Sequence, residues 1–453
     1  QRAVPVDTGS VPMVLRQPDS RLIYFAATGG NFYCDRLYAS GEVDDAFNGI
    51  RTSKKAWGPA GTCRTRTSTL DKWNRILIAG SCRKAGHSVP TLVRLTKTGD
   101  PDGDFEGMVQ PVVGDSARFE TIIVQPDEKM MGVGTCWTSG VAHIFLSGHQ
   151  YNGARDAGFG TAGVMIDKTL PGSAYTVGAA RQPDGKLVVG ANAVTDDSTA
   201  VLLVRYAPNG SRDMSFGQNG VVALSGGAST TIWGRKMLLL ADGGVQTGGT
   251  ITNADGSKTL FVAKYTANGL ADTTFGSGGV IKIPLMASGR MDDMAFLPDS
   301  GLVISATGKA KAVMNGSRQI LLRCNAAGKP DSAWGFGAAN GIKAQILKNG
   351  ALAVGHSVAV SPLDGRVHAV SEMTEAGKPE TTVYLSAFLQ NNDLGIVDMA
   401  DRRRQNLVYP LLVDGEVSFS YELVDSQRVT ITVTDEAGKT VTTITQNELK
   451  PEG

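Results

Sequence analysis

Few side chains in this sequence are placed to do chemistry, and none forms a familiar catalytic pattern. No two histidines share a metal-binding spacing such as H-x-x-x-H, and the sequence lacks C-x-x-C, G-x-S-x-G, the P-loop and the Rossmann fingerprint. The histidines are His87, His143, His149, His356 and His368. His143 lies in an apolar run, residues 142–146, where a buried sheet histidine is expected rather than a metal ligand. We therefore predict no catalytic, cofactor-binding or metal-binding residue, and a function that is not enzymatic.

Aspartates recur at regular positions and offer one alternative, a structural cation such as calcium. At six regularly recurring corners an Asp precedes an aromatic residue by three positions. The pairs are Asp44 and Phe47, Asp102 and Phe105, Asp156 and Phe159, Asp213 and Phe216, Asp272 and Phe275, and Asp331 and Trp334. This strict offset favours a structural corner, in which Asp bonds the amides of its own turn and the ring packs between repeats.

Two acidic pairs and four tryptophans depart from this regular pattern. Asp196-Asp197 and Asp292-Asp293 could each hold a cation, but we expect them in or near loops, solvated at the surface. The irregular tryptophans are Trp57, Trp73, Trp137 and Trp233. Such rings can stack on sugars or anchor a partner, although a wedge between repeats is the favoured interpretation.

These residues are set in an all-β unit of about 57 residues that recurs seven times. The Asp of its first turn stands at positions 127, 184, 242 and 299, which are 57, 58 and 57 residues apart. In the fourth copy the pattern predicts strands at residues 175–180, 187–191, 200–206 and 220–224. Four antiparallel strands per copy predict a seven-bladed β-propeller over residues 1–400, and the alternative is a solenoid.

The two ends of the repeat region are expected to complete one blade together. The seventh copy lacks the Asp-x-x-Phe-Gly corner, whereas residues 3–6 precede the first copy where other copies have a fourth strand. We expect residues 3–6 to pair in the same sheet as the strand at residues 382–389. That pairing would cover two sheet edges that are otherwise open.

Two of the five cysteines are placed to face each other. Cys63 and Cys82 flank the turn at Lys72-Trp73 almost symmetrically, which predicts neighbouring positions on one hairpin. A cross-strand disulfide is our prediction, and buried thiols are the alternative, because a slip of one residue would send the two side chains to opposite faces. The other cysteines, Cys34, Cys136 and Cys324, have no evident partner.

Three motifs of the fourth copy resemble the delta-60 repeats of large exported or surface proteins of bacteria. They are a Gln-Pro-Asp-Gly-Lys turn at 182–186, an Arg-Tyr-x-x-Asn-Gly strand end at 205–210 and an Asp-x-x-Phe-Gly-x-x-Gly corner at 213–220. The resemblance implies propeller blades and an extracellular, cell-surface or periplasmic location. Because that family has no agreed activity, it assigns no catalytic residue to this chain.

The C-terminal part of the sequence differs from the repeats. A basic linker at residues 401–406 precedes runs of alternating polar and apolar residues at 417–423, 429–435 and 438–444. Residues 407–453 resemble the first strands of the Ig-like domain of flagellar hook-capping proteins. These are too few strands to close a sandwich, so we expect this segment to pair with a protein partner or a neighbouring subunit.

The charge balance and the apolar content of the chain argue against some classes of function. The chain has 44 basic and 43 acidic residues and a net charge of +1, which argues against a nucleic-acid partner. No apolar run approaches the roughly 18 residues of a transmembrane helix, and a start at Gln1 fits removal of an export signal. We predict an exported structural or protein-interaction module of a bacterial surface assembly. The alternatives are a glycan lyase or hydrolase, with reactive residues converging on the central channel from several blades, and a glycan-binding lectin.

Overall fold

The computed structural model describes strands throughout the repeat region and two strands near the C-terminus. The described residues are 13–19, 21–28, 31–38, 43–47, 63–106, 111, 113–227, 229–285, 289–308, 318–331, 334, 342–344, 352–360, 367–374, 381–388, 427–434 and 440–450. They contain no helix, and so none long and apolar enough to cross a membrane.

The chain divides into two compact units. The larger is Ala3–Asp393, and the smaller is Leu394–Gly453 together with Gln1–Arg2. In the smaller unit, β26 (Gln427–Thr434) and β27 (Thr440–Lys450) form an antiparallel hairpin. The expected strand at residues 417–423 and the basic linker at 401–406 lie outside the described residues.

The larger unit is built from antiparallel sheets of consecutive strands, which we number as blades 1 to 7. In chain order the sheets are β1 (Met13–Arg16), β2 (Leu22–Thr28) and β3 (Asn31–Leu37); β4 (Cys63–Leu70), β5 (Ile76–Lys84) and β6 (His87–Leu95); β7 (Ser116–Val124), β8 (Met130–Thr138), β9 (Val141–His149) and β10 (Val164–Asp167); β11 (Ser173–Arg181), β12 (Leu187–Val194), β13 (Thr199–Tyr206) and β14 (Val221–Ser225); β15 (Thr231–Leu239), β16 (Val245–Thr252), β17 (Lys258–Tyr265) and β18 (Val280–Leu285); β19 (Gly289–Phe296), β20 (Leu302–Gly308), β21 (Arg318–Cys324) and β22 (Ile342–Ala344); and β23 (Leu352–Val360), β24 (Val367–Thr374) and β25 (Thr381–Phe388).

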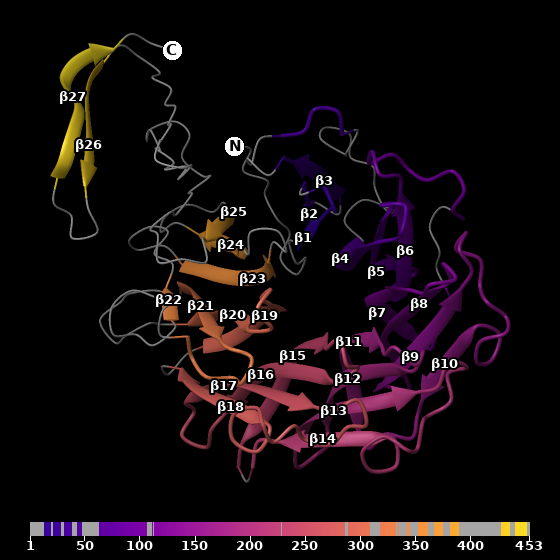
Figure 1. Ribbon diagram of the computed structural model, residues 1–453. Coiled ribbons are helices and arrows are strands. Elements are labelled where there is room, and N and C mark those ends of the chain that lie inside the picture. Colours follow the sequence, from indigo (N-terminus) through magenta and orange to yellow (C-terminus); the bar gives the residue numbers. More distant parts are fainter. Residues whose placement is uncertain are drawn as a thin grey trace. The chain divides into compact units, whose positions relative to one another are not determined.

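The blades follow one another around a central axis, with the first strand of each blade innermost (Figure 1). Strand β1 lies beside both β4 and β23, so the first and last blades meet and the ring is closed. The predicted propeller is therefore confirmed and the solenoid is excluded. Blade 4 has the four predicted strands, each within about two or three residues of its expected ends. Residues 3–6, expected to complete blade 7, lie outside the described residues.

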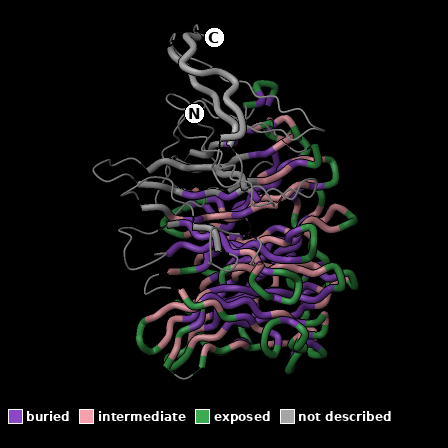
Figure 2. The backbone as a smooth tube through the Cα atoms, turned by 60° about the vertical axis from the view of Figure 1, so that its left-hand side comes forward, coloured by how far each residue is buried: buried purple, intermediate pink, exposed green. Residues whose placement is uncertain are grey.

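Burial follows the position of a strand within its blade. The second strands of blades 2 to 6 are buried along nearly their whole length, because each blade packs between two others. Buried residues, purple in Figure 2, lie in the interior of the blades. These strands read as continuous runs of small and apolar residues rather than as alternating patterns. The turns at the blade ends are exposed, and polar residues and glycines occupy them.

One buried histidine makes the stability of blade 3 depend on pH. His149 is 1% exposed, donates from Nδ1 to the carbonyl oxygen of Gly153 at 3.2 Å, and lies 2.8 Å from the Ser147 hydroxyl. Burial lowers the pKa of His149 from its ordinary 6.5 to about 4. The native state therefore binds fewer protons than the unfolded chain between these two values.

We expect this histidine to weaken the fold in mild acid. Its contribution is complete above pH 6.5 and is lost as the pH falls towards 4, by roughly 3 kcal/mol in total. Denaturant unfolding at pH 7 and pH 4.5 measures the loss. His149→Leu, which places in blade 3 the residue type found at the matching Leu95 of blade 2, is expected to lose less stability over that interval. Equal losses in the two proteins would contradict the assignment.

Candidate functional site

The repeated Asp residues serve the blade corners. In five copies the Asp Oδ1 accepts the backbone N–H two residues later, at Ala46, Asp104, Gly158, Ser215 and Thr274. The Asp carbonyl accepts the N–H of the aromatic residue three positions on, as in Asp213 and Phe216 at 3.2 Å. The three-residue offset is thus a hydrogen-bonded turn.

Sequence reasoning missed the cation that pairs with each corner Asp. It stands eight residues earlier, on the third strand of the blade, in five copies. These residues are Arg36, Arg94, Arg205, Lys264 and Arg323. The recurring Arg-Tyr or Arg-Leu strand end was the signal that could have found them. In blade 3 this position is Gly148, and Lys129 reaches Asp156 instead at 2.9 Å.

The corner cations also join neighbouring blades. Arg205 is 2% exposed, forms an ion pair with Asp213 at 2.9 Å, and donates to the carbonyl oxygen of Ala267 in blade 5 at 2.7 Å. Its guanidinium lies 4.8 Å from the centre of the Phe216 ring. That ring in turn packs on Gly269 of blade 5, where a Cβ atom would come within 3.0 Å of it. The corner is therefore a structural link between blades.

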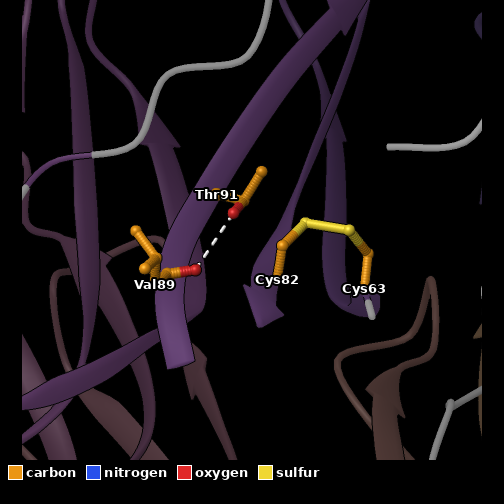
Figure 3. Close-up of a disulfide and its surroundings, with 4 residues drawn as sticks. All are labelled: Cys63, Cys82, Val89 and Thr91. Atoms are coloured by element: carbon orange, nitrogen blue, oxygen red, sulfur yellow. Dashed lines mark hydrogen bonds between the residues drawn. A yellow bond between two sulfur atoms is a disulfide. The ribbon is translucent and has the colours of Figure 1, made fainter. Parts of the chain in front are cut away.

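Cys63 and Cys82 are joined by a disulfide with an S–S distance of 2.08 Å (Figure 3). They are directly opposed in the register of β4 and β5. The bridge lies beside β6, in which the Thr91 hydroxyl donates to the carbonyl oxygen of Val89 at 3.0 Å. Cys34, Cys136 and Cys324 are buried free thiols, and burial raises the pKa of Cys136 to about 12.

A β-bulge in each innermost strand of blades 2 to 7 marks the central channel. At each bulge the pairing skips one residue, which leaves the ladder. The skipped residues, called here the bulge ring, are Arg66, Glu120, Val177, Arg235, Asp292 and His356. All six line one cavity of about 580 Å³. The equivalent position in blade 1 lies outside the described residues.

Two carboxylates of this cavity overturn the expectation of a solvated surface pair. Asp292 and Asp293 lie in the innermost strand β19 and are 4% and 6% exposed. Burial raises the pKa of Asp292, although the Thr307 hydroxyl donates to it and Arg290 pairs with it at 2.9 Å. Asp293 accepts from Lys236 at 2.8 Å. The sequence signal for this burial is position, because Asp292 stands seven residues before the first-turn Asp299 and so lies on an innermost strand. Asp196-Asp197 is exposed, as expected.

Basic residues also line the cavity. Arg118 pairs with Glu120, two residues on in β7. Arg66 is partly buried, and its Nε atom has no hydrogen-bond partner among the described residues. Burial lowers the pKa of Arg66, the Glu120 carboxylate opposes this, and the positive charges of Arg118, Arg235 and Arg64 lower the pKa further. Arg235 is exposed towards solvent.

A row of aromatic rings from three consecutive blades adjoins the cavity. The ring centre of Tyr175 lies 6.5 Å from that of Trp137 and 6.1 Å from that of Trp233. Tyr175 and Trp233 line the cavity, and Trp233 is 45% exposed. Trp73, at the tip of the first turn of blade 2, is 46% exposed between Lys72 and Arg75. A wedge between blades is therefore wrong for Trp73, whereas Trp233 contacts Tyr175 of the neighbouring blade but is half-exposed. Trp57 lies outside the described residues.

The described residues offer no group of three or more His, Cys, Asp or Glu side chains placed to hold a metal ion. His143 is 8% exposed in β9, as expected of a sheet histidine, and His87 is exposed. The channel histidine, His356, gives no sequence signal beyond its place in the repeat. The side chain of His368 lies outside the described residues.

One family model matches two stretches of the chain, residues 182–216 and 240–275, and is described as "Domain of unknown function (DUF5122) beta-propeller". Each match runs from the first turn to the corner aromatic of its blade, in blades 4 and 5. The chain thus carries β-propeller repeats of this kind. No curated protein matches the chain.

Solved structures with a similar fold have very different sequences. A prolyl endopeptidase aligns with a TM-score of 0.45 and 12% identity over 84% of this chain and 50% of its own. The polysaccharide lyase Uly1 aligns with a TM-score of 0.47 and 10% identity over 84% and 90%. Drosophila Plexin A, solved in complex with Semaphorin 1b, aligns with 0.44 and 10% over 85% and 86%. The chain spans half the length of the endopeptidase, and at these identities the likeness concerns the fold alone.

Proposed function

We propose that this protein is a binding propeller, without enzymatic activity, that takes a glycan at the mouth of its central channel. The observation that carries the proposal is the aromatic row of Trp137, Tyr175 and Trp233 beside a cavity of about 580 Å³. Exposed aromatic faces stack on the apolar faces of sugar rings, and the cavity beyond them supplies polar groups that fix the orientation.

The channel carboxylates favour binding over catalysis because bonding partners hold them. Glu120 pairs with Arg118, Asp292 with Arg290 and Asp293 with Lys236. A propeller enzyme acting on glycans is the second candidate, and one observation favours it. Burial raises the pKa of Asp292, and this acid lines the same cavity as His356.

Export to a bacterial cell surface or to the periplasm is part of the proposal. The Cys63–Cys82 disulfide supports it, because such bridges persist in oxidising compartments. The C-terminal segment, with its resemblance to an Ig-like domain, would join the propeller to a protein partner or a neighbouring subunit. Two reactive thiols at these positions in protein isolated from its natural source would speak against export.

Glycan binding by paired tryptophan variants tests the function. We expect Trp233→Ala to weaken binding of a screened oligosaccharide about tenfold or more, since it removes a stacking face. Trp73→Ala is the matched control, because Trp73 is equally exposed but lies past the other end of an innermost strand. Equal losses, or no binding by the unaltered protein, would refute the proposal. New reducing ends or unsaturated products after incubation would favour the enzyme.

A further inference from the structure

The cavity holds more positive charge than its own carboxylates neutralise. Its basic residues are Arg66, Arg118, Arg235 and Lys236, and its acidic residues are Glu120, Asp292 and Asp293. Arg118 is paired with Glu120 and Lys236 with Asp293. The remaining carboxylate, Asp292, takes its ion pair from Arg290, outside the cavity lining.

Two guanidinium groups are consequently left without an ionic partner. Among the described residues neither Arg66 nor Arg235 forms an ion pair, and Arg235 makes only a long hydrogen bond of 3.4 Å to the carbonyl oxygen of Asp292. The buried Nε of Arg66 has no hydrogen-bond partner in the same residues. A buried N–H donor without an acceptor is unfavourable, so an anion that reaches this donor would stabilise it.

The two groups face the same cavity, and the positive charge of Arg235 acts on Arg66. Arg66 and Arg235 occupy the same position of the bulge ring, on blades 2 and 5, three blades apart around the axis. Both line the one cavity. Between them in the ring lie Glu120, already paired, and Val177, which is uncharged. A planar guanidinium presents paired N–H donors that match the oxygens of a carboxylate or a sulfate.

We propose that Arg66 and Arg235 form an anion site, which selects glycans that carry carboxylate or sulfate groups. The aromatic row would hold the sugar rings at the channel mouth, and the two arginines would hold an acidic substituent inside it. This inference rests on the proposed function for the sugar backbone, but the anion site itself can be tested without any glycan.

Calorimetric titration with four probes separates the parts of the proposal. The probes are oligogalacturonate, its methyl ester, a sulfated neutral oligosaccharide and inorganic sulfate. We expect at least one acidic oligosaccharide to bind roughly tenfold or more tighter than the methyl ester, and to weaken as salt is raised. Arg66→Met and Arg235→Met are each expected to lose roughly tenfold or more of that affinity. Arg83→Met is the control, since Arg83 is exposed on β5 and does not line the cavity.

The outcomes of this titration distinguish the anion site from glycan binding. Equal binding of acidic and neutral oligosaccharides, unchanged in both variants, would overturn the anion site and leave glycan binding intact. Sulfate that binds and is lost in Arg66→Met, with no oligosaccharide bound, would support the anion site and refute the glycan. Binding of none of the probes would refute both. If Arg66→Met does not fold, the exposed Arg235→Met and the sulfate titration still decide. Preference between the two acidic oligosaccharides identifies the anionic group.

Discussion

Replacing Arg205 by Met is expected to lower the free energy of unfolding of the propeller by about 3 kcal/mol. The substitution keeps an apolar stem of similar length but removes the partner of Asp213 and the donor to the carbonyl oxygen of Ala267 in the next blade. The loss should fall at the low end of the range for a broken buried pair, because Lys186 still faces Asp213 at 3.0 Å. Denaturant unfolding followed by tryptophan fluorescence measures it.

The equivalent lysine of blade 5 supplies the matched control. Lys264 pairs with Asp272 at 2.9 Å, but both side chains are about one-fifth exposed. Lys264→Met should therefore cost no more than about 1 kcal/mol. If the two variants lost similar free energies of unfolding, the burial of the ion pair and its bond to the next blade would not determine how much the corner contributes to stability.

A second large effect on stability is expected in blade 3. Two contacting positions there hold a large and a small residue, unlike the equivalent positions of blade 4. Phe119 is fully buried and fills a position held by Thr176 in blade 4, and Gly132 stands where blade 4 has Val189. A Cβ atom on Gly132 would come within 2.2 Å of the Phe119 ring. Gly132→Val alone should cost about 2–3 kcal/mol through overpacking. Phe119→Thr alone should cost about 3 kcal/mol or more through the cavity that it leaves.

The two changes together give blade 3 the pair that blade 4 already has. We expect the double variant to be clearly more stable than the sum of the single losses predicts, because the valine fills the space that the phenylalanine leaves. The double-mutant cycle, measured by denaturant unfolding, gives the coupling directly. If the losses of unfolding free energy were additive, the residue type that one position tolerates would not depend on the residue at the other position.

The sequence by itself determined the propeller, because every blade repeats the same local solution. A turn at each Asp of the first-turn series, and a corner with Asp three residues before an aromatic ring, are formed by residues close in the chain. The Cys63–Cys82 disulfide also lies within one hairpin, but the turn alone does not set its register, because the bulge at Arg66 shifts the pairing by one residue between the turn and Cys63. The partners of these features are local, so the residue order specifies them.

Only the tertiary structure decided where the proposed binding site lies. No one side-chain type is common to all residues of the bulge ring, so the repeat pattern does not mark this position. The positions from Arg66 to Asp292 each stand seven residues before the Asp, or its substitute Trp73, of the first turn, and this spacing places them on the innermost strands. The two ring carboxylates, Glu120 and Asp292, form ion pairs with residues two positions away on their own strands. The unmatched Arg66 and Arg235 appear only when blades 2 and 5 close around one axis.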